Sequence, residues 1–182
     1  MASLAAARRS IASTTFVLTL VLLLVPAGAN AKGGGGVLSI SGRIGEVHLG
    51  STLRAVRSYA GSPTRRVQIT GENGVPGTEY RYECGRGCGT SYIFNGRGRL
   101  TNFITTSTRW RTAAGTNVGD ALEDAEAAEG KQAKIQGCGG DTPTIYKRGR
   151  VALFINVSQA DGDGPELITG FALAGPGSIL GC

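Results

Sequence analysis

The chain has 182 residues, of which 41% are hydrophobic and 6% aromatic, and its 19 Lys and Arg against 13 Asp and Glu give a formal net charge of +6. This length suits one domain or two small ones and excludes a large multidomain enzyme, while the hydrophobic content excludes a wholly disordered chain. The single histidine, His48, removes most catalytic and metal-binding schemes that depend on imidazole.

The first 31 residues have the features of a cleavable export signal. Arg8 and Arg9 form a positive n-region, residues 11–25 form an apolar stretch, and Ala29-Asn30-Ala31 is a small-x-small cleavage motif. The apolar stretch is shorter than the roughly 20 residues that a spanning helix needs, which disfavours a retained anchor. We therefore expect cleavage after Ala31, a secreted or extracytoplasmic mature chain, and no transmembrane segment in that mature chain.

Charge is unevenly distributed along the predicted mature chain. Without the two arginines of the signal, 17 basic residues face 13 acidic ones, a net charge of +4. Residues 32–112 hold 12 basic and 4 acidic residues (+8), whereas residues 113–182 hold 5 and 9 (−4). Nucleic acid is a poor partner, because the chain is exported and its acidic half repels phosphate. An acidic protein or an anionic envelope polymer fits better.

Two short helices are predicted, one in each half of the chain. Ser51 supplies the N-cap of the first helix and Gly61 ends it. A similar pattern begins at Val118-Gly119-Asp120, where Asp120 and Glu123 form a capping-box pair, and it ends at Gly130. Residues 32–36 are rich in glycine and are predicted to be a flexible leader.

Antiparallel strands are predicted after each helix. Alternation of apolar and polar residues indicates strands over 80–84, 92–94, 100–106, 151–157 and 168–173, with a tight turn at Asn95-Gly96. Gly87-Cys88-Gly89, Arg97-Gly98-Arg99 and Phe103-Ile104 recur in the same order as Gly137-Cys138-Gly139, Arg148-Gly149-Arg150 and Phe154-Ile155. We predict an α+β fold of two tandem helix-plus-antiparallel-strand repeats, residues 37–112 and 113–182, with the helices on one face of a disulfide-stabilised antiparallel sheet.

Two groups of motifs in the first predicted repeat match a known family. They are Gly50-Ser51-Thr52, Val56 and Gly61-Ser62-Pro63, and then Tyr80-x-Tyr82 and Phe94-Asn95-x3-Arg99-Leu100. Through these motifs, residues 44–103 resemble the SmpA/OmlA small lipoproteins and the related β-lactamase inhibitor proteins. The second repeat keeps only the start of the pattern, and the chain lacks the lipid-attachment cysteine of the outer-membrane relatives. The resemblance implies two units joined into a concave sheet that binds a protein; it implies neither catalysis nor a β-lactamase target.

Four cysteines in an exported chain predict two disulfides, for which three connectivities are possible. We favour Cys84 with Cys88, across a tight Gly-Arg-Gly turn, and Cys138 with Cys182. The alternative is a metal site of Cys84, Cys88, Cys138 and His48. That alternative is weaker because zinc-binding pairs are more often spaced C-x2-C and because thiols oxidise outside the cell. We expect neither a metal nor a cofactor.

No pattern in the sequence predicts catalysis. His48 has no ordered nucleophile or second partner, so a structural or surface role is expected. The acidic residues around the second helix fit a solvated face, and Asp161-x-Asp163-Gly164 lacks the remaining calcium ligands of an EF-hand loop. We expect a protein that is not an enzyme and has no catalytic residues.

Arginine and aromatic residues gather in the first half and predict a contact surface, because arginine, tyrosine and tryptophan dominate interface hot spots. The predicted binding residues are Tyr80, Tyr82, Tyr92, Arg97, Arg99, Arg109 and Trp110. The alternative is a solvated basic face beside ordinary core aromatics. The predicted function is a secreted, non-enzymatic protein-binding module, of which an inhibitor is one kind. The alternative function is a structural protein of the cell envelope whose basic half binds anionic polymer or lipid headgroups.

Overall fold

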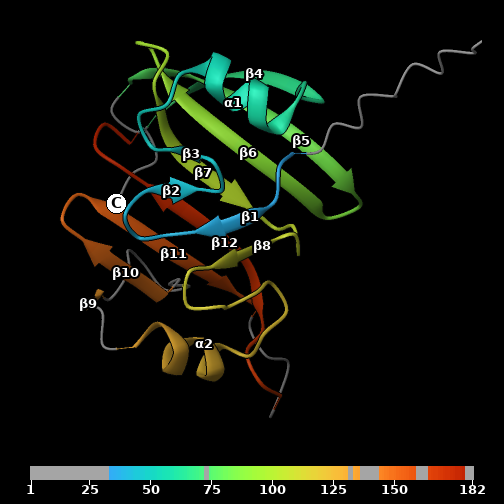
Figure 1. Cartoon of the computed structure of the whole chain (residues 1–182), viewed down its shortest axis with the longest axis vertical. Coiled ribbons are helices and arrows are strands. Elements are labelled where there is room, and N and C mark those ends of the chain that lie inside the picture. Colours follow the sequence, from blue (N-terminus) through green and yellow to red (C-terminus); the bar gives the residue numbers. More distant parts are fainter. Residues whose placement is uncertain (1–32, 72–73, 131–132, 136–143, 159–163, 179–182) are drawn as a thin grey trace, which may run out of the picture.

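The computed structural model describes residues 33–71, 74–130, 133–135, 144–158 and 164–178. In these ranges the chain forms twelve strands, arranged in two sheets, and two helices (Figure 1). The predicted export signal, the predicted Cys138–Cys182 disulfide and the Asp161-x-Asp163 motif lie outside the described residues.

The larger sheet has eight strands in the order β4-β5-β6-β7-β12-β11-β10-β9, and every neighbouring pair is antiparallel. Its strands are β4 (Arg65–Thr70), β5 (Pro76–Gly85), β6 (Cys88–Asn95), β7 (Leu100–Thr105), β9 (Ala133–Ile135), β10 (Thr144–Arg148), β11 (Val151–Val157) and β12 (Ile168–Ala174). Because β7 pairs with β12, both halves of the chain share one hydrogen-bonded sheet.

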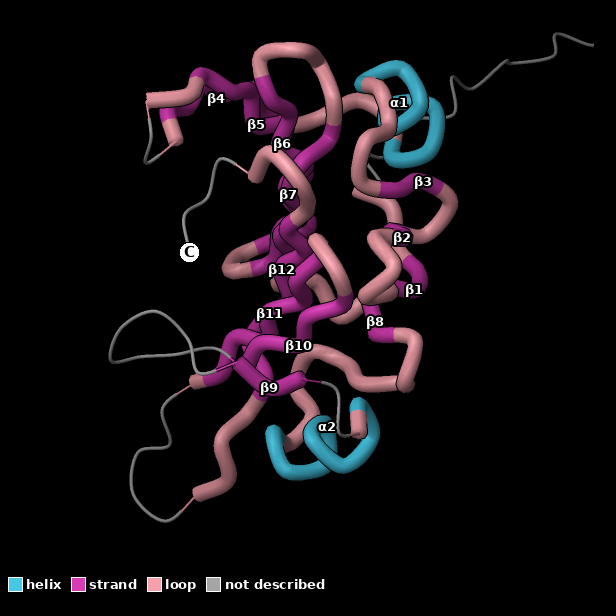
Figure 2. Tube along the Cα trace, turned by 90° about the vertical axis from the view of Figure 1, so that its left-hand side faces the viewer, coloured by secondary structure: helices cyan, strands magenta, loops and turns pink. Residues whose placement is uncertain are grey.

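The smaller sheet has the order β3-β2-β1-β8, in which β1 and β8 are parallel. Its strands are β1 (Gly36–Leu38), β2 (Arg43–Ile44), β3 (Val47–His48) and β8 (Trp110–Thr112), and the helices are α1 (Leu53–Ala60) and α2 (Leu122–Glu129). Figure 2 shows that the small sheet and both helices lie on the same side of the large sheet, and we call the surface beneath them the core face. The opposite surface, which carries Arg81, Ser91, Ile104 and Phe154, is called the open face.

The core face is explained by the alternation of side chains along each strand. On β5, Tyr80 and Tyr82 are buried, whereas the intervening Arg81 is exposed, because successive side chains of a strand point to opposite faces. Tyr80 lies opposite Tyr92, Tyr92 opposite Phe103, and Phe103 opposite Leu173 in the sheet register. This row of large buried side chains continues across the sheet and forms the centre of the core.

Helix α1 forms where the sequence predicts it, with a different N-cap. Thr52 Oγ1 accepts the N–H of Ala55 at 3.4 Å, so Thr52 is the cap. The hydroxyl of Ser51, the predicted cap, instead accepts the N–H of His48 at 3.1 Å. Gly61 ends the helix with φ = 84°, as predicted from its glycine.

Helix α2 also forms as predicted, without the predicted capping box. Its N-cap is Ala121, which has no side-chain hydrogen bond to the helix. Asp120 Oδ2 accepts the N–H of Asn117 at 2.7 Å instead. Both described helices have eight residues, and neither is long and apolar enough to cross a membrane.

The glycine-rich segment at residues 33–36, predicted to be a flexible leader, packs against the aromatic core. Tyr92 Oη donates a hydrogen bond to the carbonyl of Gly33 at 3.1 Å, and Tyr59 Oη donates one to the carbonyl of Gly35. Gly36 already belongs to β1. A Cβ atom on Gly34 would lie 2.7 Å from Cε1 of Tyr59, so the aromatic rings leave no room for a side chain here.

The predicted fold of two tandem helix-plus-antiparallel-strand repeats is wrong, because the described chain is β-rich and includes a second sheet that the prediction lacked. The repeated motifs mark common turns: Gly98 and Gly149 both have positive φ (68° and 60°) in turns between strands. The match of Phe103 with Phe154 also fails, since Phe103 is buried on the core face whereas Phe154 lies on the open face.

Candidate functional site

Four of the predicted contact residues are buried in the core. Tyr80, Tyr82, Tyr92 and Trp110 are each at most 5% exposed. The rings of Tyr82 and Tyr92 meet edge to face with centroids 5.5 Å apart, and burial raises the pKa of the Tyr92 hydroxyl. These four side chains hold the layers together and are not accessible to a partner.

The three predicted contact arginines are exposed and lie on two different turns. Arg97 and Arg99 are in the turn between β6 and β7, where both backbone N–H groups donate to Asn95 Oδ1 at 3.0 and 3.1 Å. Arg109 lies between β7 and β8, and its carbonyl accepts the N–H of Gly36 at 3.0 Å. The structure therefore does not join the predicted residues into one contact surface.

The open face of the large sheet carries a different set of candidate contact residues from the seven predicted binding residues. In register across β4, β5, β6, β7, β12 and β11 lie Arg65, Arg81, Ser91, Ile104, Ala172 and Phe154. Ile104 and Phe154 are partly exposed, with the small Ala172 between them. Among the described elements, no helix or strand lies over this face (Figure 2). The face has an apolar centre and a basic end.

One short segment returns over part of the open face. Gly175 continues the pairing of β12, where its N–H donates to the carbonyl of Thr101 at 3.0 Å, and the following turn brings Ser178 back to β7. Asn102 Nδ2 then donates to Ser178 Oγ at 2.7 Å. This contact covers Asn102, which is 1% exposed, and leaves Ile104 and Phe154 partly exposed.

A charged network fixes the basic end of the open face. Glu79 is 7% exposed, and its carboxylate accepts hydrogen bonds from Arg81 Nε at 2.7 Å, Arg81 Nη2 at 2.9 Å and Ser91 Oγ at 2.7 Å. Burial alone would raise the pKa of Glu79, but these hydrogen bonds and the charges of Arg81 and Arg65 outweigh burial and lower it. Arg81 thus makes a bidentate contact with the Glu79 carboxylate, and its side chain is still 45% exposed.

Replacing Glu79 with glutamine is expected to make stability less dependent on acidic pH. The lowered pKa means that the carboxylate stabilises the fold fully above its ordinary value of 4.5 and that this contribution is lost as pH falls further. Between about pH 6 and pH 3, the free energy of unfolding measured in urea should therefore fall less for Glu79→Gln than for the wild type. At neutral pH the variant should lose about 1 kcal/mol, because Arg81 is half exposed.

Glu83→Gln is the matched control for this measurement. Glu83 lies on the same strand and the same face but is exposed. Its substitution should leave the pH profile of unfolding like that of the wild type. Identical profiles for Glu79→Gln and the wild type would contradict the assigned network.

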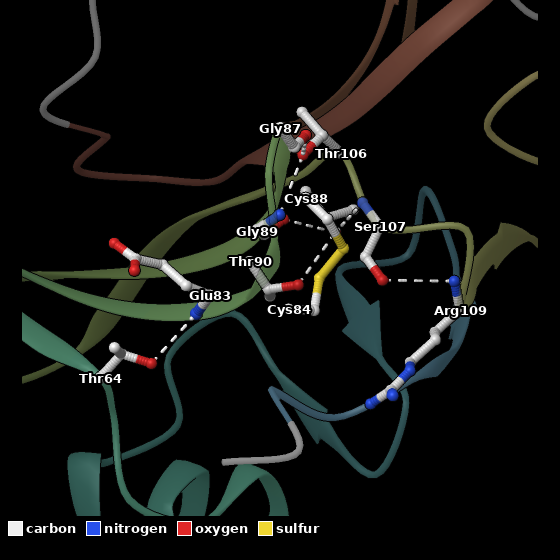
Figure 3. The surroundings of a disulfide bond; sticks show 11 residues. Thr64, Glu83, Cys84, Gly87, Cys88, Gly89, Thr90, Thr106, Ser107 and Arg109 are labelled. Carbon is white, nitrogen blue, oxygen red and sulfur yellow. Dashed lines mark hydrogen bonds between the residues drawn. A yellow bond between two sulfur atoms is a disulfide. The ribbon is translucent and has the colours of Figure 1, made fainter. Parts of the chain in front are cut away.

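The predicted disulfide between Cys84 and Cys88 is confirmed. It closes the turn between β5 and β6, with the two Cα atoms 5.2 Å apart (Figure 3). Thr106, which follows β7, binds the same turn: its hydroxyl donates to the carbonyl of Gly87 at 2.9 Å and accepts the N–H of Gly89 at 3.0 Å. The turn is therefore attached to the sheet by side-chain hydrogen bonds as well as by sulfur.

Removing this disulfide is expected to destabilise the fold moderately. The loop that it closes is short, and the chain-entropy relation then gives a loss of about 2 kcal/mol in Cys84→Ser/Cys88→Ser. Urea unfolding of this variant, and of the wild type under a thiol reductant, should show the same loss. An unchanged midpoint in both experiments would contradict the expectation.

The part of the chain that the structure describes does not bring His48 and the cysteines together as a metal site. His48 is exposed, and Cys84 and Cys88 are bonded to each other, so neither sulfur is free to bind a metal. Within the described ranges, no group of three His, Cys, Asp or Glu side chains could hold a metal ion. Cys138, the remaining member of the alternative metal site, lies outside the described residues.

No family model and no curated protein matches the chain. Among solved structures, the fold is similar to that of the uncharacterized protein YfeY from Escherichia coli, with a TM-score of 0.53, 13% identity, and coverage of 76% of this chain and 99% of that one. An extracellular protein with an SCP domain from Bacillus anthracis gives a TM-score of 0.43 at 10% identity, covering 70% of this chain and 44% of that one. The predicted membership in the SmpA/OmlA and β-lactamase inhibitor protein family is therefore wrong; the likeness to YfeY is one of fold alone.

Proposed function

We propose that the chain is a non-enzymatic protein-binding module that contacts its partner through the open face of the large sheet. The observation that carries this proposal is the one-sided arrangement of the layers, with the small sheet and both helices over the core face. Ile104 and Phe154 lie partly exposed on the other face, with an alanine between them. An apolar centre with a charged border is the usual composition of a protein interface.

The charge of the open face favours an acidic partner. Arg81 is held in a fixed position by Glu79 and keeps nearly half of its side chain exposed, so it meets a partner with little loss of side-chain entropy. Arg65 lies directly opposite Arg81 in the register of β4 and β5. Preordered arginines next to apolar side chains are frequent hot spots of protein interfaces.

We also place the site of action outside the cytoplasm. The signal-like pattern of residues 1–31 and the Cys84–Cys88 disulfide support this location, because disulfides persist in oxidising compartments. The partner is then an exported or surface protein of the same environment.

Site-specific photo-crosslinking tests the proposed function. A photoreactive residue at Phe154 on the open face should capture one or more acidic host proteins reproducibly, in both low and high salt. The same residue at Ser58, which is exposed on α1, is the matched control and should capture none of them. Equal capture at both positions, or capture at Ser58 alone, would show that the open face is not the contact surface.

A further inference from the structure

We propose that the free edge of β4 binds an extended segment of the partner as an added strand, with acidic residues beside Arg65 and Arg66 and apolar residues beside Val67 and Ile69. This inference rests on the proposed function and specifies the form and chemistry of the partner. Among the described residues, β4 has β5 as its sole strand neighbour and ends the large sheet (Figure 1). A strand in that position presents unpaired backbone N–H and C=O groups, which is the basis of recognition by strand addition.

The edge of β4 lacks most of the features that usually block pairing. Its six residues pair continuously with β5, without a register shift, whereas irregularities occur between β5 and β6, β6 and β7, and β11 and β12. The part from Val67 to Thr70 contains neither proline nor a charged residue, and three of its four residues are β-branched. Such a regular, extended edge is a suitable template for another strand.

The side chains of β4 define what the added strand must carry. Arg65, Val67 and Ile69 lie on the open-face side, and Arg66, Gln68 and Thr70 lie on the other side. Side chains directly opposite one another on neighbouring strands have Cβ atoms roughly 5 Å apart, so each residue of β4 would contact one residue of the partner. The matching strand is therefore acidic at one end, apolar at alternate positions on the open-face side, and polar on the other.

Charge favours an acidic partner strand over a second copy of this chain. Arg57 and Arg66 both lie over the ring of Tyr80, with guanidinium carbons 5.8 Å from its centroid. Glu79, the carboxylate beside Arg65, is already bound by Arg81. In an antiparallel pairing of two copies through β4, the Arg65–Arg66 end of each copy would lie beside the uncharged Val67–Thr70 part of the other copy, so neither arginine pair would meet an opposite charge. Acidic side chains on a partner strand would neutralise these arginines.

The test uses the full chain and a defined peptide, acetyl-Thr-Val-Thr-Val-Glu-Glu-amide, whose order matches an antiparallel neighbour of β4. At millimolar peptide, NMR should show saturable shifts across Val67 to Thr70. Hydrogen-exchange protection should increase at the alternate amides of this segment that point away from β5. A peptide that ends in Lys-Lys in place of Glu-Glu should bind the wild-type chain at least roughly tenfold more weakly. The double variant Arg65→Ala/Arg66→Ala should lose affinity for the original peptide by a similar factor. Arg97→Ala/Arg99→Ala, with two exposed arginines removed from another turn, is the matched control and should bind like the wild type.

Three outcomes would overturn the inference. They are the absence of saturable shifts, shifts centred on Ile104 or Phe154 in place of β4, and concentration-dependent protection of β4 without peptide, which would assign the edge to a second copy of the chain. Failure here with successful crosslinking at Phe154 would leave the open-face function standing without the added strand. Binding at β4 with no crosslink at Phe154 would support the added strand and contradict contact through the open face.

Discussion

Replacing Phe103 with alanine is expected to lower the free energy of unfolding by about 3–5 kcal/mol, the range for removal of a buried phenylalanine ring. Phe103 is 0% exposed, and its ring contacts those of Tyr92 and Trp110 with centroid distances of 5.2 and 4.7 Å. Its removal leaves a cavity where the large sheet meets the small one. Urea and thermal unfolding should show the loss, with a fall in Tm of roughly 10 °C.

Phe154→Ala is the matched control, since it removes the same ring from the same large sheet. Phe154 lies on the open face and is partly exposed, so its replacement removes less buried apolar surface than the replacement of Phe103 does. The expected loss is at most about 1.5 kcal/mol. Equal losses for the two variants would contradict the assignment of Phe103 to the core face and of Phe154 to the open face.

Replacing Gly34 with alanine is expected to destabilise the fold by about 3 kcal/mol, because a strained backbone and overpacking add together. Gly34 has φ = 71°, and a Cβ atom there would lie 2.7 Å from Tyr59 Cε1, 3.0 Å from Tyr92 Oη and 3.2 Å from Trp110 Cζ2. The rings cannot move apart easily, since Tyr59 and Tyr92 also hydrogen-bond the neighbouring glycines. Urea unfolding measures the effect.

Gly98→Ala separates the two causes. Gly98 has nearly the same φ, 68°, but a Cβ atom there would meet nothing within 4 Å. Its substitution should cost only the backbone strain of about 1–2 kcal/mol. If Gly34→Ala destabilises no more than Gly98→Ala, the segment at residues 33–36 is not packed against the aromatic rings.

The alternation of residues within β5 already indicates that some of the predicted contact residues are buried. Tyr80 and Tyr82 alternate with Arg81 and Glu83, so the tyrosines and the charged residues must point to opposite faces. Grouping tyrosines and arginines by composition placed buried residues in a binding site. The same rule would have assigned the tyrosines to the core and Arg81 to the opposite surface.

Other parts of the candidate site could not be read from the sequence. Both Phe103 and Ile104 are apolar, as are Phe154 and Ile155, so alternation does not say which member of each pair faces the core. The answer depends on the register between β7, β12 and β11, which is set by contacts between distant residues. The smaller sheet was missed for a related reason, because its strands have only two or three residues.

The sequence by itself determined the local elements of this protein: helix α1 and its ending at Gly61, helix α2, the strands β5 and β11, and the Cys84–Cys88 disulfide. Each of these depends on neighbouring residues, through capping, alternation or a short covalent loop. The tertiary structure decided that the glycine segment packs on aromatic rings and that Ser91 of β6 donates a hydrogen bond to the buried Glu79 of β5. Both features arise where segments far apart in sequence, or on separate strands, meet, and neither has a local sequence signal.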